Sequence, residues 1–400
     1  MSKSTDIAAL FDQYVMHTYA PSATLTSGSG CKVRDPDGMT YLDFTAGIAV
    51  HNVGHCHPKV VKAIQAQVAT LGHCSNLFYN INQALLAQRL SKLSLNGKCF
   101  FCNSGAEANE AMIKLARLWG HEKGKYEVVT MQNSFHGRTL ATIAATGQAK
   151  VQKGFDPLPI GFAYAEYNNL ESVKAAINER TVAVMLEVVQ GEGGVISATE
   201  EFFVGVRKLC DEKGLLMLCD EVQCGMGRTG KWFGWQNFPV KPDAFTLAKA
   251  LADGIPMGAL VASPAISDLF KPGMHASTFG GNPVSSAAAL AVMDVIEEEA
   301  LVKHAEEVGN LFTEGLAAFV EKYKQVLEVR GKGLMVGLVV EGDAKEVVNA
   351  CRDMGLLCCV AGEHVVRFLP PLNTKESDLE EALEMIGDAL DQLYGSEEEA

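Results

Sequence analysis

Residues 215–223 read Leu-Leu-Met-Leu-Cys-Asp-Glu-Val-Gln, so five apolar side chains stand directly before a carboxylate. A run this short and this apolar predicts a strand that is buried on both faces, as in the parallel sheets of α/β proteins. Polar side chains that follow such strands gather at the carboxyl edge of the sheet, where ligands bind. Asp220 therefore marks both a strand end and a candidate site.

The same alternation of apolar runs and amphipathic stretches extends over the middle of the chain. It predicts a doubly wound α/β domain with a mostly parallel sheet and helices on both faces. The expected strands are 98–102, 126–131, 182–189, 215–219, 244–247 and 258–262, with helices at 106–119 and 201–213 among them. The polar residues that follow these strands are 103–105, 134–138, Glu187, 190–192, Asp220, Glu221 and Lys249.

The C-terminal part has a different pattern, which predicts a smaller α+β domain. We expect helices at 284–296, up to 323, at 345–354 and at 375–393, with short strands at 326–329, 334–340, 356–360 and 365–368. Asp35-Pro36-Asp37-Gly38 is typical of a hairpin turn, and the first 50 or so residues do not fit the sheet rhythm. We therefore expect a large domain of residues 49–285 and a small domain of residues 1–48 and 286–400. The acidic end, 395–400, is expected to be solvated.

Composition restricts the partners. The 400 residues include 34 Lys and Arg against 48 Asp and Glu, a net charge of −14, which disfavours binding to nucleic acid or to an anionic membrane. No apolar run approaches the ~20 residues that span a bilayer. Eleven scattered Cys and an N-terminus without the apolar core of a secretory signal favour a reducing, cytoplasmic location.

Ser104, Gly105 and Ala106 stand between an expected strand and an expected helix. A hydroxyl and free backbone N–H groups at a helix start form a site suited to a phosphate. A simple helix cap explains the same residues equally well.

Asp220 and Lys249 both stand in apolar surroundings. Burial raises a carboxyl pKa, so an ionised Asp220 implies a positive partner, although a metal such as the magnesium of a nucleotide would also suit Asp220-Glu221. A Lys among apolar neighbours has a lowered pKa and can attack an aldehyde, whereas most Lys side chains are only solvated surface charges. Together with the helix start, the two residues describe one ligand, pyridoxal phosphate.

Several long motifs, in the right order, resemble the class III pyridoxal-phosphate aminotransferases, which have the type I aminotransferase fold. Within that family they are most similar to the acetylornithine aminotransferases, from about residue 20 to the end. The motifs are 41–44, 46–50, 101–109, 134–139, 146–148, 190–194, 220–223, 227–230 and 246–249.

The resemblance implies a role for each cofactor residue. Lys249 would hold the cofactor covalently and move the substrate proton, and Asp220 would pair with the pyridine nitrogen. Phe135 would stack on the ring, and Gln223 would bind its phenolic oxygen. The phosphate would be bound by the amides of Gly105 and Ala106 and by Thr278 of a neighbouring subunit, so a homodimer with shared sites is implied. Ser104, Glu221 and Val222 complete the implied cofactor-binding set.

The resemblance also implies the substrate residues. Arg367 would bind the α-carboxylate of glutamate or 2-oxoglutarate, although an arginine in an apolar run also suits a structural ion pair. Arg138 and Ser277 would hold the carboxylate end of an acetylated diamino acid. Glu192 would neutralise Arg367 when the donor presents its terminal amine, and would swing away when an α-carboxylate arrives.

These residues lead us to expect transfer of the terminal amine of N2-acetyl-L-ornithine to 2-oxoglutarate, giving a semialdehyde and L-glutamate in arginine biosynthesis. Ornithine, 4-aminobutyrate, succinylornithine or succinyl-diaminopimelate are alternative donors. A mutase, a decarboxylase and the aminotransferase-like half of a transcription regulator are further readings, and the last lacks a basic DNA-binding segment. We expect no metal, because no carboxylate or second cluster completes a ligand set around His51, His55 and His57.

Overall fold

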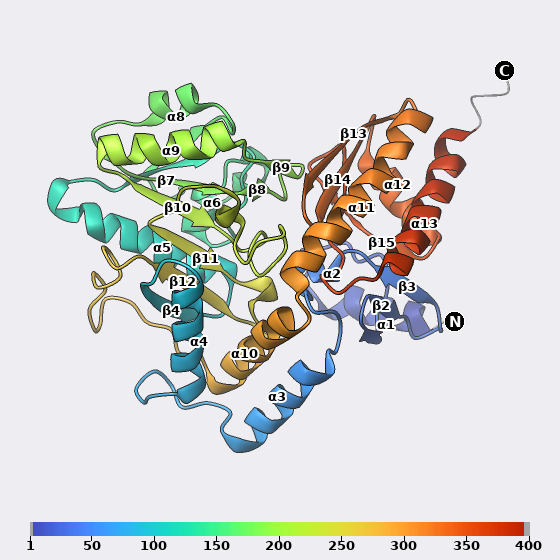
Figure 1. The fold of residues 1–400 in the computed structure, drawn as a ribbon, viewed down its shortest axis with the longest axis horizontal. Helices are drawn as coiled ribbons and strands as arrows, with labels where there is room; N and C mark the ends of the chain where they lie inside the picture. Colours follow the sequence, from blue (N-terminus) through green and yellow to red (C-terminus); the bar gives the residue numbers. More distant parts are fainter. Residues whose placement is uncertain (1–2, 396–400) are drawn as a thin grey trace.

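A computed structural model describes residues 3–395 and is built around a seven-stranded sheet (Figure 1). In spatial order the strands are β4 (Lys98–Cys102), β12 (Gly258–Ala262), β11 (Ala244–Leu247), β10 (Leu216–Asp220), β7 (Thr181–Glu187), β5 (Glu127–Met131) and β6 (Phe162–Ala165). Only β12 runs antiparallel to its neighbours in this sheet. The expected mostly parallel sheet is therefore confirmed.

Alternate side chains of the central strands enter two separate cores. Leu216 and Leu218 of β10 pack with α5 (Gly105–Gly120), whereas Met217 and Cys219 face the cluster that includes α9 (Glu200–Lys213). Every residue of β10 and β7 is buried. A strand covered by a helix layer on each face must be apolar throughout, which explains the uninterrupted run before Asp220.

The N-terminal and central chain contains further elements, some of which lie away from this sheet. They are α1 (Lys3–Tyr14), β1 (Ser27–Ser29), β2 (Lys32–Arg34), β3 (Thr40–Asp43), α2 (Ala46–Ala49), α3 (Pro58–Thr70), α4 (Ile81–Leu93), η1 (His121–Lys123), α6 (Leu140–Ala145), α7 (Ala149–Gln152), α8 (Leu170–Ala176), β8 (Val189–Gln190), β9 (Ile196–Ser197), η2 (Gly234–Asn237) and η3 (Lys249–Leu251).

The elements of the C-terminal part are α10 (Pro283–Glu298), α11 (Leu301–Lys322), β13 (Val326–Lys332), β14 (Met335–Val340), α12 (Ala344–Asp353), β15 (Leu356–Leu357), β16 (Cys359–Ala361), β17 (Val365–Phe368) and α13 (Glu376–Tyr394). Four of its strands form an antiparallel sheet in the order β13-β14-β17-β16. A second four-stranded sheet has the order β1-β2-β3-β15 and places β15 beside β3. The N-terminal strands thus pair with the C-terminal segment, as expected.

One expected strand is divided in two. Residues 356–360 were predicted as one strand, but Leu356 and Leu357 pair with β3, whereas 359–361 pair with β17. The chain changes sheets at Cys358, because the segment on each side of this residue finds its hydrogen-bond partners in a different sheet.

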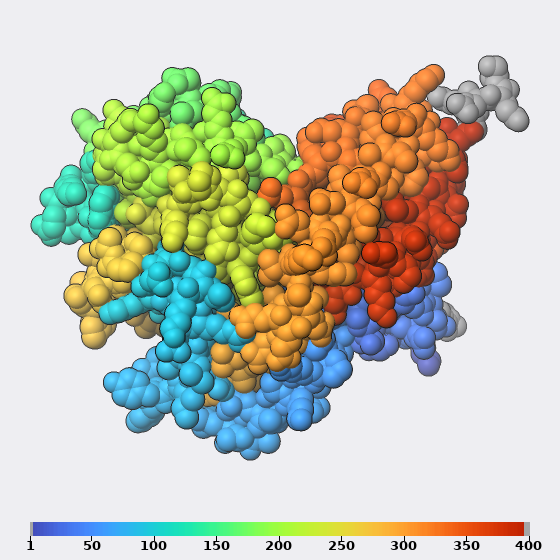
Figure 2. Space-filling model, viewed as in Figure 1, coloured from blue at the N-terminus to red at the C-terminus, as the bar shows by residue number. Residues whose placement is uncertain are grey.

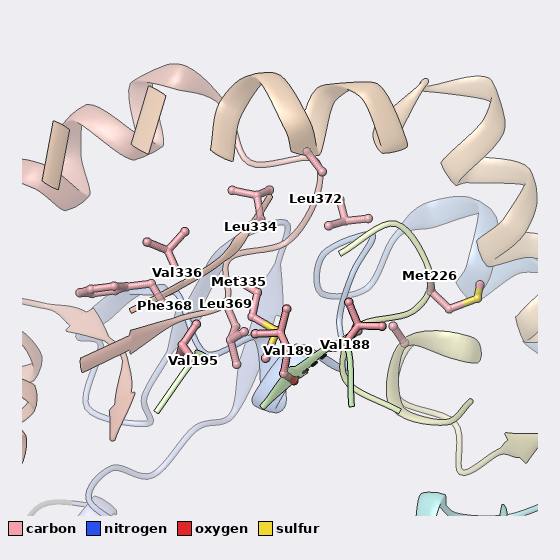
Figure 3. Close-up of a cluster of buried hydrophobic side chains, with 14 of the residues drawn as sticks. Val188, Val189, Val195, Met226, Leu334, Met335, Val336, Phe368, Leu369 and Leu372 are labelled. Atoms are coloured by element: carbon pink, nitrogen blue, oxygen red, sulfur yellow. Dashed lines mark hydrogen bonds between the residues drawn. The ribbon is translucent and has the colours of Figure 1, made fainter. Parts of the chain in front are cut away.

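The two groups of elements meet in an apolar junction. In the space-filling view they form two lobes in contact along the middle of the molecule (Figure 2). Val188, Val189, Val195 and Met226 lie against side chains of the C-terminal part, including Leu334, Met335, Val336, Phe368, Leu369 and Leu372 (Figure 3). Helix α10 packs against α3 and α4 and so joins the C-terminal part to the lobe that contains the seven-stranded sheet. The domain boundaries at 49 and 285 stay a prediction.

No helix within residues 3–395 combines the length and apolar character needed to cross a bilayer. The acidic residues 396–400 lie outside the described residues.

Candidate active site

A cavity of about 430 Å³ opens at the carboxyl ends of β4, β7, β10 and β11. This volume is typical of small-molecule sites. Ten of the residues predicted for the site line the cavity. They are Ser104, Gly105, Ala106, Phe135, Arg138, Glu192, Asp220, Val222, Gln223 and Lys249.

Asp220 is held by three hydrogen-bond donors at the floor of the cavity. Its Oδ2 atom accepts from Asn109 Nδ2 at 2.7 Å and lies 2.8 Å from His136 Nδ1, and its Oδ1 atom accepts from the backbone N–H of Val222 at 3.0 Å. Asp220 is buried. Three hydrogen-bond partners around one carboxyl group fix its orientation, so Asp220 presents its oxygens to the cavity in one position.

Glu187 lies beside Asp220 on the same edge of the sheet. The two residues are paired in register on β7 and β10, and both line the cavity. Glu187 accepts one hydrogen bond from the backbone N–H of Phe135 at 3.2 Å. Burial and the neighbouring Asp220 raise the pKa of Glu187 well above its usual value. Burial and the neighbouring carboxyl thus favour the protonated form of Glu187.

The start of α5 forms one wall. Ser104 caps the helix through Oγ, which accepts from Glu107 N at 3.2 Å, so the first amides of the helix have no intrahelical partner. A Cβ atom added to Gly105 would lie 2.8 Å from Val222 Cγ1. The approach of Val222 thus requires glycine here, and a helix start of this kind binds anions.

Lys249 follows β11 and enters the cavity with an unusual backbone conformation. Its φ angle is +46°, in a region that residues other than glycine rarely adopt. Burial lowers the pKa of the Lys249 amine, only partly opposed by the charge of Glu192. A strained backbone and a more nucleophilic amine at one residue are typical of a functional position.

Arg367 of β17 lies behind the cavity wall. It is 1% exposed, and its Nη1 atom bonds to Glu192 Oε1 at 2.7 Å and to Gln223 Oε1 at 3.0 Å. Burial opposes the charge of Glu192, but the field of Arg367 and its hydrogen bond still lower the pKa of that carboxyl. Sequence positions 192, 223 and 367 therefore meet in one ion-pair network.

Four predicted residues do not line the cavity: Arg367, Glu221, Ser277 and Thr278. Glu221 faces away, and its carboxylate accepts from the backbone N–H groups of Gly234 and Trp235, both at 2.7 Å. Burial raises the pKa of Glu221 to about 8. We therefore assign Glu221 to the stability of the 233–235 turn and not to the cofactor, because successive residues at a strand end point in opposite directions.

Ser277 lies at the edge of the site, and Thr278 lies outside the cavity. Ser277 Oγ accepts from Asn103 Nδ2 at 3.3 Å and from Gly280 N at 3.0 Å. Thr278 is exposed and reaches no part of this cavity. Arg138 is also exposed, with its guanidinium carbon 5.4 Å from the centre of the Phe135 ring.

Three residues of the site had no predicted role: Asn109, His136 and Glu187. His136 and Glu187 lie at or after the ends of expected strands, so the sequence pattern predicts that they lie at the ligand-binding edge of the sheet. The pattern does not show which side chains they contact. Asn109 is a polar side chain at a buried position of α5, and that mismatch was the available signal. All three act on or beside Asp220.

The sequence pattern of the family described as aminotransferase class-III matches residues 14–390. The chain belongs to the class-III aminotransferase family. Among curated relatives, the acetylornithine aminotransferase of Caldanaerobacter subterraneus subsp. tengcongensis is 48% identical over 386 residues, covering 95% of this chain and 98% of that protein. The acetylornithine aminotransferase of Nitrosomonas europaea is 48% identical over 375 residues, covering 92% and 95%.

Solved class-III structures superpose over the whole chain. The ornithine aminotransferase of Toxoplasma gondii gives a TM-score of 0.94 at 30% identity, covering 98% of this chain and 96% of that one. The acetylornithine aminotransferase of Elizabethkingia anophelis gives 0.87 at 32% identity, covering 98% and 100%. A second Toxoplasma gondii structure, with a TM-score of 0.93 at 30% identity, covering 97% of this chain and 94% of that one, is described with partial occupancy of PLP at its active site.

Class-III aminotransferases use pyridoxal 5′-phosphate, and the cavity fits this group. The fixed carboxyl group of Asp220 suits a protonated ring nitrogen, the start of α5 suits a phosphate, and the Lys249 amine suits an aldehyde. When bound, the cofactor supplies an aldehyde that takes up the amino group and a ring that accepts electrons. The described residues contain no group of three or more His, Cys, Asp or Glu that could hold a metal.

Proposed function

We propose that this aminotransferase moves the terminal amine of N2-acetyl-L-ornithine to 2-oxoglutarate, giving N-acetyl-L-glutamate 5-semialdehyde and L-glutamate. The observation that carries the proposal is the buried Arg367 paired with Glu192 at 2.7 Å beside the cavity. A reaction that alternates between a side-chain amine and an α-carboxylate needs an arginine that can be covered for one substrate and offered to the other.

The choice of donor follows the relatives. Those at 48% identity are acetylornithine aminotransferases, whereas the ornithine aminotransferase structure is 30% identical. Ornithine is the second candidate because that structure superposes so closely. 4-Aminobutyrate, succinylornithine and succinyl-diaminopimelate complete the panel of donors to be compared.

Each of the site residues has a proposed task. Lys249 holds the cofactor and carries the proton that leaves the substrate carbon. Asp220, fixed by Asn109 and His136, keeps the ring nitrogen protonated so that the ring can accept electrons. Phe135 covers the ring, and the carboxyl of Glu187 holds the Phe135 backbone in place.

The two ends of the substrates are bound separately in this proposal. Arg367 takes the α-carboxylate of 2-oxoglutarate or glutamate. Arg138 and Ser277 hold the carboxylate of the acetylated donor. Ser104, Gly105, Ala106 and Val222 surround the phosphate, and Gln223 faces the phenolic oxygen.

We further propose a homodimer with shared sites. A group of large apolar side chains is exposed at 77–81, with Leu77 at 83% and Tyr79 at 107%, and Phe279 is 59% exposed beside Thr278. Exposed apolar patches of this kind mark interfaces. A second copy would cover them and bring its Thr278 to the phosphate. Co-assembled Lys249→Ala and Thr278→Ala subunits test this sharing, because a mixed dimer then holds one intact site.

A panel of amine donors tests the reaction. Holoenzyme is mixed with each donor and 2-oxoglutarate, and glutamate is measured. We expect N2-acetyl-L-ornithine to give the highest kcat/KM and glutamate to form in equal amount to the semialdehyde. A higher kcat/KM for ornithine would replace the proposed donor, and turnover without 2-oxoglutarate would contradict aminotransfer. The corresponding place in the cell is arginine biosynthesis in the cytoplasm.

A further inference from the structure

Arg367 is covered by two side chains. Glu192 and Gln223 both bond to its Nη1 atom, and both line the cavity, whereas Arg367 does not. Its Nε atom faces the Cys359 thiol at 3.4 Å. Glu192 and Gln223 therefore stand together between the guanidinium and the cavity.

The orientation of Gln223 follows from the chemistry of its partner. A guanidinium is only a donor, so the carbonyl oxygen of Gln223 must face Arg367 and its N–H2 group must face elsewhere. Burial raises the pKa of the Glu192 carboxyl, whereas the charge of Arg367 and, as the smallest contribution, the Gln223 amide lower it. Glu192 and Gln223 are thus both bonded to Arg367.

Nη1 of Arg367 has two hydrogens, and the bonds to Glu192 and Gln223 use both. If Glu192 alone moved away, one hydrogen would become free, and a substrate carboxylate that accepts it must fit beside the Gln223 amide. The loop that carries Glu192 also packs directly on the Gln223 carbonyl, because a Cβ atom on the preceding residue, Gly191, would lie 2.1 Å from Gln223 Oε1.

We propose that Gln223 is a second specificity-determining residue at Arg367, which shares the guanidinium with Glu192 while the amine donor is bound and yields it when an α-carboxylate arrives. The inference rests on the proposed function, because it deepens the assignment of Arg367. It gives Gln223 a task that is separate from any contact with the cofactor.

Glutarate is the probe, because it has the length of 2-oxoglutarate and lacks the keto group that reacts. Its Kd for the holoenzyme is measured by titration calorimetry, beside that of N2-acetyl-L-norvaline, a donor analogue without the terminal amine. Gln223→Ala removes one competitor for Nη1, and hydrogen bonds to charged groups are worth at least about 1.5 kcal/mol, so we expect glutarate to bind about tenfold tighter.

Gln223→Glu should act in the opposite direction. It keeps the shape of the side chain but adds a second carboxylate on Arg367, so glutarate should bind at least about tenfold more weakly. Gly191→Ala displaces the Gln223 oxygen sterically and should tighten glutarate binding, as Gln223→Ala does. The Kd of N2-acetyl-L-norvaline should change little in all three variants.

Opposite shifts of the glutarate Kd in Gln223→Ala and Gln223→Glu would support this role of Gln223, since a merely structural defect weakens binding in both variants. Shifts in the same direction, or none, would overturn it. Glu192→Gln provides the matched comparison, and its effect should not add to that of Gln223→Ala, because both residues share one nitrogen. Failure of the wild type to bind glutarate would overturn the assignment of Arg367, whereas a different preferred donor would affect only the proposed function.

Discussion

Arg228→Met should destabilise the junction between the two lobes. Arg228 is fully buried, and its guanidinium donates to the carbonyl oxygens of Leu334, at 2.8 Å, and Pro370, and to the side-chain oxygen of Asn52. Leu334 precedes β14, and Pro370 follows β17, which carries Arg367. Arg228 therefore ties the large lobe to the segment that carries Arg367.

The loss of stability follows from the three hydrogen-bond acceptors that remain unpaired when methionine replaces Arg228. Each unpaired buried acceptor costs about 1–3 kcal/mol, partly offset because a buried charge is removed, so we expect a loss of about 4 kcal/mol. With an unfolding entropy of about 2.1 cal/mol/K per residue over the 400 residues, this lowers the Tm by about 5 °C.

Differential scanning calorimetry of the holoenzyme measures this shift. Arg352→Met is the matched control, because Arg352 is partly exposed and hydrogen-bonds to Asn349 and Asp353 of its own helix, so it should contribute under about 1 kcal/mol. The KM for 2-oxoglutarate should also rise more than the KM for the donor. A Tm for Arg228→Met within about 1 °C of the wild type would show that these hydrogen bonds do not stabilise the junction.

Three further changes follow from the same contacts. The pKa of Glu187 is raised in the folded protein above its ordinary value of 4.5, so wild-type stability should fall as the pH rises above about 4.5, and the Tm of Glu187→Gln should fall less over the same pH range. Measured above pH 8, where Glu221 is ionised, Glu221→Gln should lower stability by about 1–3 kcal/mol, because its new N–H2 group faces a backbone N–H. The visible absorbance of the bound cofactor should stay unchanged, and an altered absorbance would return Glu221 to the cofactor site. The added methyl group of Gly105→Ala should collide with Val222 and weaken cofactor retention, measured by dialysis, about tenfold. Unchanged retention would show that the close approach of Gly105 and Val222 is not needed to hold the cofactor.

Much of the fold could be predicted because burial on both faces leaves a direct mark in the sequence. The apolar run before Asp220 admits few interpretations, and its strand lies where the pattern placed it. Asp220 and Lys249 could be chosen because ionisable groups in apolar surroundings need a reason to be there. Both line the cavity.

Partners in space could not be predicted in the same way. Nothing adjacent to Arg228 in the sequence shows that it binds the carbonyl oxygens of Leu334 and Pro370, more than 100 residues away. The sheet change at Cys358 depends on which edges are available, and the turn of Glu221 away from the cavity depends on two amides of a later loop. Such contacts are set by tertiary packing, which local patterns do not encode.

The proposed function depends on the amine of Lys249 carrying the cofactor. Borohydride reduction of the holoenzyme, followed by peptide mapping of the attached pyridoxyl group, tests this attachment. We predict one labelled peptide, modified at Lys249, and no stable label in Lys249→Ala. A label on another lysine, or none in the wild type, would show that Lys249 does not hold the cofactor.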